Sequence, residues 1–270
     1  MAAAVTLILG NPIEVESTVH NALPDGTGNG LSAFYYALLL LLAGFTGSFV
    51  VSMLVDSMLG FVPAEFGPVY RFAEQVKISR FHTLLIKWAF MVVLALLTSG
   101  GYMLIAGQLG MPIPHSLPLW LFGTFAIAAV GITSTSLIAV LGALGLLVSM
   151  FVFVILGLPS AGATVPLQAA PPLFGWLAKF EPMHQVFLGT RALLYLNGQA
   201  DAGLSQALTM TAIGLAIGLL LGGIVTLIYD RRGYHRIPPG FAATSWPESA
   251  AGTELTTEPA ATAETTKNAE

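Results

Sequence analysis

The feature that most constrains the fold of this chain is an uncharged run of about 40 residues, from Leu119 to Leu158. A single straight helix of that length would measure about 60 Å, twice the thickness of the hydrocarbon core of a bilayer. The run therefore predicts two membrane spans, 119–137 and 140–158, joined by a tight turn. Gly142 and Gly145 lie where the turn is expected, and glycine tolerates the backbone angles of tight turns.

Three more apolar runs have the roughly 20 residues that a membrane-spanning helix needs: 31–55, 83–106 and 204–229. Apolar residues make up 55% of the 270 residues and charged residues only 9%, a composition typical of integral membrane proteins. The predicted fold class is an all-α polytopic membrane protein with five transmembrane helices.

The distribution of Lys and Arg predicts the orientation of these helices. With five spans, the loop 61–82 and the C-terminal flank lie on one side of the membrane, and the positive-inside rule places the more basic side in the cytoplasm. That side carries Arg71, Lys77, Arg80, Lys87, Arg231, Arg232 and Arg236, whereas the other side carries Lys179 and Arg191. The expected location is the cell membrane, with the N-terminus outside.

Two polar ends flank the predicted membrane domain, 31–237. Residues 1–30 contain no Lys or Arg and several turn-forming residues, so they are interpreted as an extracytoplasmic lead-in. Residues 238–270 are rich in Ala, Thr, Glu, Ser and Pro without apolar periodicity, which predicts a disordered cytoplasmic tail.

The stretch 158–198 interrupts the series of spans. Its two apolar pieces, within 171–197, hold about 8 and 14 residues, so as helices of about 12 and 21 Å neither crosses the membrane. Joining them into one span would put Lys179, Glu181 and Arg191 into lipid, at about 2.5–3.5 kcal/mol for each charge. The stretch therefore predicts a broken, re-entrant helical hairpin on the outer side.

The polar residues of this hairpin are Glu181, His184 and Arg191, and they are the predicted outer gate. Glu181 is expected to cap the helix that starts near Met183, because its charge suits the positive end of the helix dipole. His184 either pairs with Glu181 as a titratable couple or makes a structural hydrogen bond. Arg191 either faces a polar vestibule, pairs elsewhere, or lies with the others in the headgroup region.

Between the first two spans, Val69, Phe72, Val76 and Arg80 belong to a pattern with apolar residues on one helical face and charged residues on the other. The pattern predicts a short amphipathic helix on the cytoplasmic membrane surface, with an ordinary basic loop as the alternative.

The last span carries Gly214, Gly218 and Gly222 at intervals of four residues, which predicts a close helix–helix contact. Four hydroxyl residues, Thr133 to Ser136, either line a polar path or bond to their own helix backbone.

No catalytic, cofactor or metal site is predicted. The chain has no cysteine, its five histidines are scattered, and no nucleotide-binding or hydrolase motif occurs. We therefore expect neither an enzyme nor a nucleic-acid-binding protein, and the expected surroundings are the lipid bilayer.

The order of segments resembles the type-2 ABC transporter (ABC-2) permeases, and within them the bacterial phage infection protein (YhgE/Pip) family. The resemblance is carried by NALPDGTGNGLSAFYYALLL (21–40), LPSAGATVP (158–166) and PPLFGWLAKFEPMHQVFLGTR (171–191). Family members usually begin with a further span and a large extracytoplasmic domain, which this chain lacks. A truncated or split gene product is therefore one interpretation.

The resemblance implies a permease subunit that exports an amphipathic or lipid-like envelope substrate. It also implies a separate ATPase subunit, with the helix around Val69–Arg80 as the coupling helix, and a homodimer or a hetero-partner in the membrane. The alternative is a membrane scaffold or receptor that does not transport, because relatives of the phage-infection type often have no obvious ATPase partner.

Overall fold

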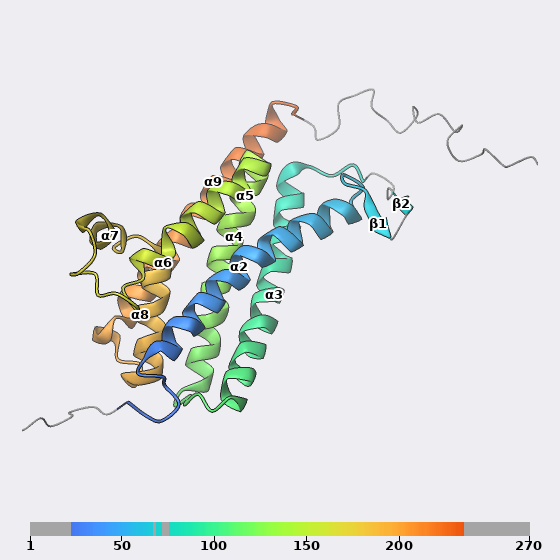
Figure 1. Ribbon diagram of the computed structural model, residues 1–270. Coiled ribbons are helices and arrows are strands. Elements are labelled where there is room, and N and C mark those ends of the chain that lie inside the picture. Colours follow the sequence, from blue (N-terminus) through green and yellow to red (C-terminus); the bar gives the residue numbers. More distant parts are fainter. Residues whose placement is uncertain (1–22, 67–68, 72–75, 235–270) are drawn as a thin grey trace, which may run out of the picture. The chain divides into compact units, whose positions relative to one another are not determined.

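The computed structural model describes residues 23–66, 69–71 and 76–234, and its long elements are helices (Figure 1). Five of them are long and apolar enough to cross a membrane: α2 (Leu31–Met58), α3 (Arg80–Gln108), α4 (Ser116–Leu141), the continuous helix Ala143–Ser160 and α9 (Leu204–Arg231). The predicted fold class is confirmed, and the chain is a multi-pass membrane protein. The predicted lead-in and tail fall mainly on 1–22 and 235–270, which lie outside the described residues.

The fourth of these helices is irregular. It consists of α5 (Ala143–Met150), a π-helical stretch η1 (Phe151–Ile155) and α6 (Gly157–Ser160). It follows α4 after one residue, Gly142, whose φ of 64° lies in the left-handed region that favours glycine. Gly145 then packs so closely on Leu137 that any side chain would collide with the backbone of α4. The uncharged run therefore folds into two helices at the predicted junction.

The broken hairpin is also present. Helix α7 (Pro172–Leu177) and helix α8 (Pro182–Tyr195) follow α6, and a single turn of 3₁₀ helix, η2 (Ala200–Ala202), leads into α9. At 14 residues, α8 is about 21 Å long and cannot cross the membrane by itself.

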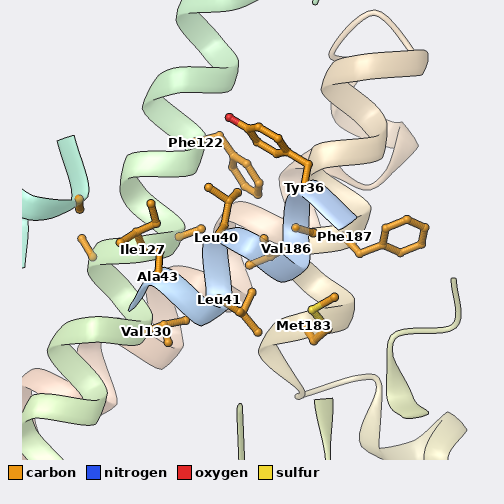
Figure 2. Close-up of a cluster of buried hydrophobic side chains, with 14 of the residues drawn as sticks. Tyr36, Leu40, Leu41, Ala43, Phe122, Ile127, Val130, Met183, Val186 and Phe187 are labelled. Atoms are coloured by element: carbon orange, nitrogen blue, oxygen red, sulfur yellow. The ribbon is translucent and has the colours of Figure 1, made fainter. Parts of the chain in front are cut away.

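Helix α4 is the centre of the bundle and packs against α2, α3, α8 and α9. Two glycines make close approach possible, because a side chain at Gly44 would meet Ile127 and Val130, and one at Gly123 would meet Ser99 and Leu40. Figure 2 shows the resulting cluster, in which apolar side chains of α2, α4 and α8 meet. Labelled members are Tyr36, Leu40, Leu41, Ala43, Phe122, Ile127, Val130, Met183, Val186 and Phe187.

The segment between α2 and α3 differs from the predicted amphipathic helix. Strands β1 (Ala64–Phe66) and β2 (Val69–Arg71) pair antiparallel, with Ala64 opposite Arg71. Val69 thus belongs to a strand, Val76 to an extended piece whose amide donates to the carbonyl of Leu59, and Arg80 to α3. Phe72 lies outside the described residues.

Two features explain why the helical prediction was wrong here. Val69 and Tyr70 have β-branched and aromatic side chains, which favour strands. Ser79 is the N-cap of α3, and its hydroxyl accepts a hydrogen bond from the amide of His82 at 3.2 Å, so helical structure starts only after it. The fourth residue of the pattern, Arg80, therefore begins a membrane helix.

Candidate functional site

Glu181 begins helix α8 and is buried, with 3% of its surface exposed. Its side chain accepts a hydrogen bond from the amide of His184 at 3.0 Å, and Pro182 occupies the first helical position, where a missing N–H costs nothing. Glu181 is thus the N-cap of α8, as the sequence predicts.

The second carboxylate oxygen of Glu181, Oε1, has no hydrogen-bond partner within the described part of the chain. It faces Gly157 of α6, where an added Cβ would lie 2.9 Å from it. Burial raises the pKa of Glu181 to about 7, although the amides of Met183 and His184 and the nearby hydroxyl of Ser160 act in the opposite direction. The hydroxyl of Ser160 also donates to the carbonyl of Leu156, at 2.6 Å.

Two further side chains connect α8 to the rest of the hairpin. The ring nitrogen Nδ1 of His184 lies 2.8 Å from the carbonyl oxygen of Ala161, just after α6. The amide of Gln185 donates to the carbonyls of Ala178 and Lys179, just after α7, at 2.9 and 3.2 Å. His184 therefore makes a structural bond, and both residues satisfy backbone groups that the break leaves without helical partners.

Arg191 lies two and a half turns further along α8 and is exposed. Its guanidinium carbon is 5.8 Å from the centre of the Phe187 ring, and within the described residues it makes no ion pair. Both side chains line a cavity of about 540 Å³, which is otherwise formed by Leu23, Asn29, Gly30, Leu31, Gly162, Ala163, Tyr195 and Leu196.

Tyr195 closes the far end of α8 against α2. Its hydroxyl lies 2.6 Å from the hydroxyl of Ser32 and accepts a hydrogen bond from the amide of Ala33 at 3.2 Å. The cavity thus has a mixed wall, with apolar side chains from Leu23, Leu31 and Phe187 and polar groups from Asn29, Arg191 and Tyr195.

The three predicted gate residues lie on one helix but do not form one cluster. Glu181 and His184 are at the buried start of α8, and Arg191 is about 15 Å from Glu181 along the helix. Chemically, the carboxyl group of Glu181 can hold a proton, and the guanidinium group of Arg191 can hold an anion. Within 23–66, 69–71 and 76–234, no group of three His, Asp or Glu side chains could hold a metal ion.

Comparison with known families adds one result. A family model described as "Protein of unknown function (DUF3533)" matches residues 1–219, which is most of the chain. The chain belongs to the DUF3533 family. Searches of curated proteins and of solved structures gave no match.

In this DUF3533 protein, the predicted glycine stripe is only partly a contact. A side chain at Gly218 would collide with Thr133 of α4, and a Cβ at Gly222 would lie 2.7 Å from the Cβ of Ser136. A Cβ at Gly214 would meet nothing within 4 Å, although its carbonyl oxygen is 3.4 Å from the Thr133 hydroxyl. The partner of the stripe is therefore α4 of the same chain. Thr135 and Ser136 donate to carbonyls one turn back in α4.

Sequence reasoning missed three polar residues of the DUF3533 protein. Gln185 and Tyr195 hold the hairpin, and Lys87 forms a 2.9 Å ion pair with Asp56 between α3 and α2. The sequence contained a signal only for the Lys87–Asp56 pair. Asp56 follows the end of one predicted span and Lys87 lies near the start of the next, on the same side of the membrane.

Proposed function

We propose that this DUF3533 protein is a permease subunit of the ABC-2 type that exports an amphipathic or lipid-like envelope substrate through the outer hairpin. The observation that carries the proposal is the cavity beside α8. Part of its wall is apolar, from Leu23, Leu31 and Phe187, and matches an acyl or other hydrophobic chain, while Arg191 matches a negative headgroup. In this proposal a separate ATPase subunit powers export.

Arg191 is the sharpest place to test the proposal. In cells that export a fluorescent, short-chain phosphatidylglycerol, Arg191→Ala should lower the amount that albumin extracts from the outer leaflet about tenfold, because a charge-assisted contact is lost. Arg191→Lys should restore part of it. Lys179→Ala is the matched control, since Lys179 is an exposed cation of the same hairpin that does not line the cavity.

The result separates the permease from a scaffold or receptor. If wild-type protein moves no more labelled lipid than empty membranes, the transport proposal fails and the scaffold alternative stands. If Arg191→Ala exports as well as wild type, the cavity is not the route.

The proposed orientation has the N-terminus outside and the C-terminus in the cytoplasm, since Arg80, Lys87 and Arg231 gather at one end of the bundle. The chain has no cysteine, so single cysteines can be introduced without background. A cysteine at the exposed position Ser116 should react with an impermeant maleimide in intact cells, and one at Lys77 should react only after lysis. The opposite pattern would reverse the orientation.

A further inference from the structure

The start of α8 lies deep within the bundle. Tyr195, at the end of α8, contacts Ser32 in the first turn of α2, and Glu181 is about 20 Å back along α8 from that contact. Glu181 therefore lies far from the Ser32 end of α2, and its carboxyl group is buried between α6 and α8.

Within 23–66, 69–71 and 76–234, no cation forms an ion pair with this carboxyl group. Helix α6 offers Gly157 and Ser160, and α8 offers His184, whose ring is bonded to the carbonyl of Ala161. Lys179 is two residues before Glu181 and exposed. On the other elements that pack against α8, the ionisable side chains are Tyr35, Tyr36 and Asp56 of α2, Tyr229, Asp230 and Arg231 of α9, and Asp201 of η2. Asp56 is paired with Lys87, Asp230 and Arg231 are at the other end of α9 from the hairpin, and Asp201 follows the C-terminus of α8.

A second buried polar group with an unsatisfied hydrogen-bond acceptor lies one turn further along α8. The amide oxygen of Gln185, a side chain 1% exposed, has no hydrogen-bond partner within the described residues, although its nitrogen has two. Gln185 lies in the first turn of α8, four residues after its N-cap Glu181. A π-helical stretch, η1, precedes α6, which contacts the carboxyl group through Gly157, and such stretches often occur at functional sites.

We propose that Glu181 is a proton-binding site that keeps the hairpin closed when it is protonated and opens it to water when it is ionised. The step is a transfer of one proton between Oε1 and bulk water, with no other reactant. A neutral carboxyl suits a site without a cation, whereas a carboxylate there must gain water. The loop between α6 and α7 adjoins the site through the contact of the Ala161 carbonyl with His184. That this switch regulates export rests on the proposed permease function; the proton site itself does not.

Infrared difference spectroscopy of the full chain in lipid vesicles, recorded between about pH 5 and about pH 9, detects the C=O stretch of a protonated carboxyl directly. We expect a band that disappears with a midpoint near pH 7. The band should be absent in Glu181→Gln and shifted in Glu181→Asp, which retains a carboxyl group and serves if the glutamine variant does not fold. His184→Asn should keep the band, because asparagine can still bond to the carbonyl of Ala161.

Opening of the hairpin is measured separately. A single cysteine replaces Ala161, which is buried beside the site, and its labelling rate is divided by that of a cysteine at the exposed position Ser205. The ratio removes most of the pH dependence of the thiol itself. We expect the ratio to rise severalfold as Glu181 ionises, and to stay level in the Glu181→Gln background.

Three results would overturn the proposal: no carboxyl band near neutral pH in the wild type, a band that survives in Glu181→Gln, or a labelling ratio whose pH dependence is lost in His184→Asn but retained in Glu181→Gln. Neither readout requires transport. A protein with the Glu181 band and an inactive export assay would therefore refute the permease and keep the proton site.

Discussion

The two ends of the helical bundle differ in whether their charged side chains have partners of opposite charge. At the end where α2 finishes and α3 begins, Lys87 is 1% exposed and bonds to Asp56, and the carboxylate of Asp230 accepts hydrogen bonds from the amides of Arg80 and Phe81. In the hairpin, Glu181 is almost as buried but has no cation, and Arg191 has no carboxylate within the described residues.

This difference indicates that the two ends of the bundle have different structural roles. Paired charges with two-sided hydrogen bonds hold α2, α3 and α9 together at one end, because separating them would leave charges without partners in a low dielectric. In the hairpin, Glu181 and Arg191 have no ion-pair partner within the described residues, so the entry of water breaks no ion pair there. A paired end and a hairpin that can take up water would suit the outward-opening permease proposed above. The following variants test this contrast, from the largest expected effect to the smallest.

The largest effect is expected from breaking the clamp. Asp56→Ala leaves the ammonium group of Lys87 buried without its carboxylate, which should lower the free energy of unfolding by about 3–5 kcal/mol. Thermal unfolding in detergent measures the loss. The double variant Asp56→Leu with Lys87→Met should recover most of it, because it removes both charges and keeps the volume. If the single variant is as stable as the wild type, the ion pair is not a clamp.

The next effect concerns pH and the hairpin. The pKa of Glu181 is raised from 4.5 to about 7, so between these values the folded protein holds a proton that the unfolded chain has lost. Stability is therefore highest below about pH 4.5, falls by about 3 kcal/mol as the pH rises to 7, and does not change further through this group. Glu181→Gln should match wild type at low pH and exceed it above pH 7, in unfolding measured across that range. A constant difference between the two proteins would contradict this sign.

A smaller effect is expected where α9 contacts α4. Gly218→Leu should destabilise the protein by about 1–3 kcal/mol, because its side chain collides with Thr133. Gly214→Leu is the matched control on the same helix, since its side chain meets open space. Unfolding temperatures of the two variants should therefore differ clearly. Equal losses would mean that the glycines act through backbone flexibility, and not through contact.

The same glycines show what sequence could predict and what it could not. The five spans and the break at Pro182 follow from local composition, and so does the cap by Glu181. The helix packing does not, because glycines four residues apart turn by about 40° per step around a helix with 3.6 residues per turn. Gly214 is thus rotated away from α4 while Gly222 faces it, and only the neighbouring helix decides which glycine is used.

Pairing across the sequence was beyond prediction for a related reason. Strands β1 and β2 exist because each supplies the other's hydrogen bonds, whereas the helical pattern of Val69, Val76 and Arg80 was counted along a single segment. The bond of Gln185 to the end of α7 likewise depends on how the chain turns between the two helices. Local patterns identified Glu181, His184 and Arg191 as polar residues of the hairpin, but the burial of Glu181 and the exposure of Arg191 needed the structure.

The smallest effect tests whether the outer end is held at all. Helix α2 has Gly30 as its N-cap and no side-chain cap, and the hydroxyl of Tyr195 accepts a hydrogen bond from the amide of Ala33 in its first turn. Tyr195→Phe removes that acceptor and the bond to Ser32, so it should cost about 0.5–1.5 kcal/mol in thermal unfolding. Tyr35→Phe is the control, because Tyr35 lies in the first turns of α2 and its side chain is 56% exposed. If the two variants lose the same stability, the hydroxyl does not hold α8 to α2, and the contrast between a clamped end and a loosely held end becomes stronger.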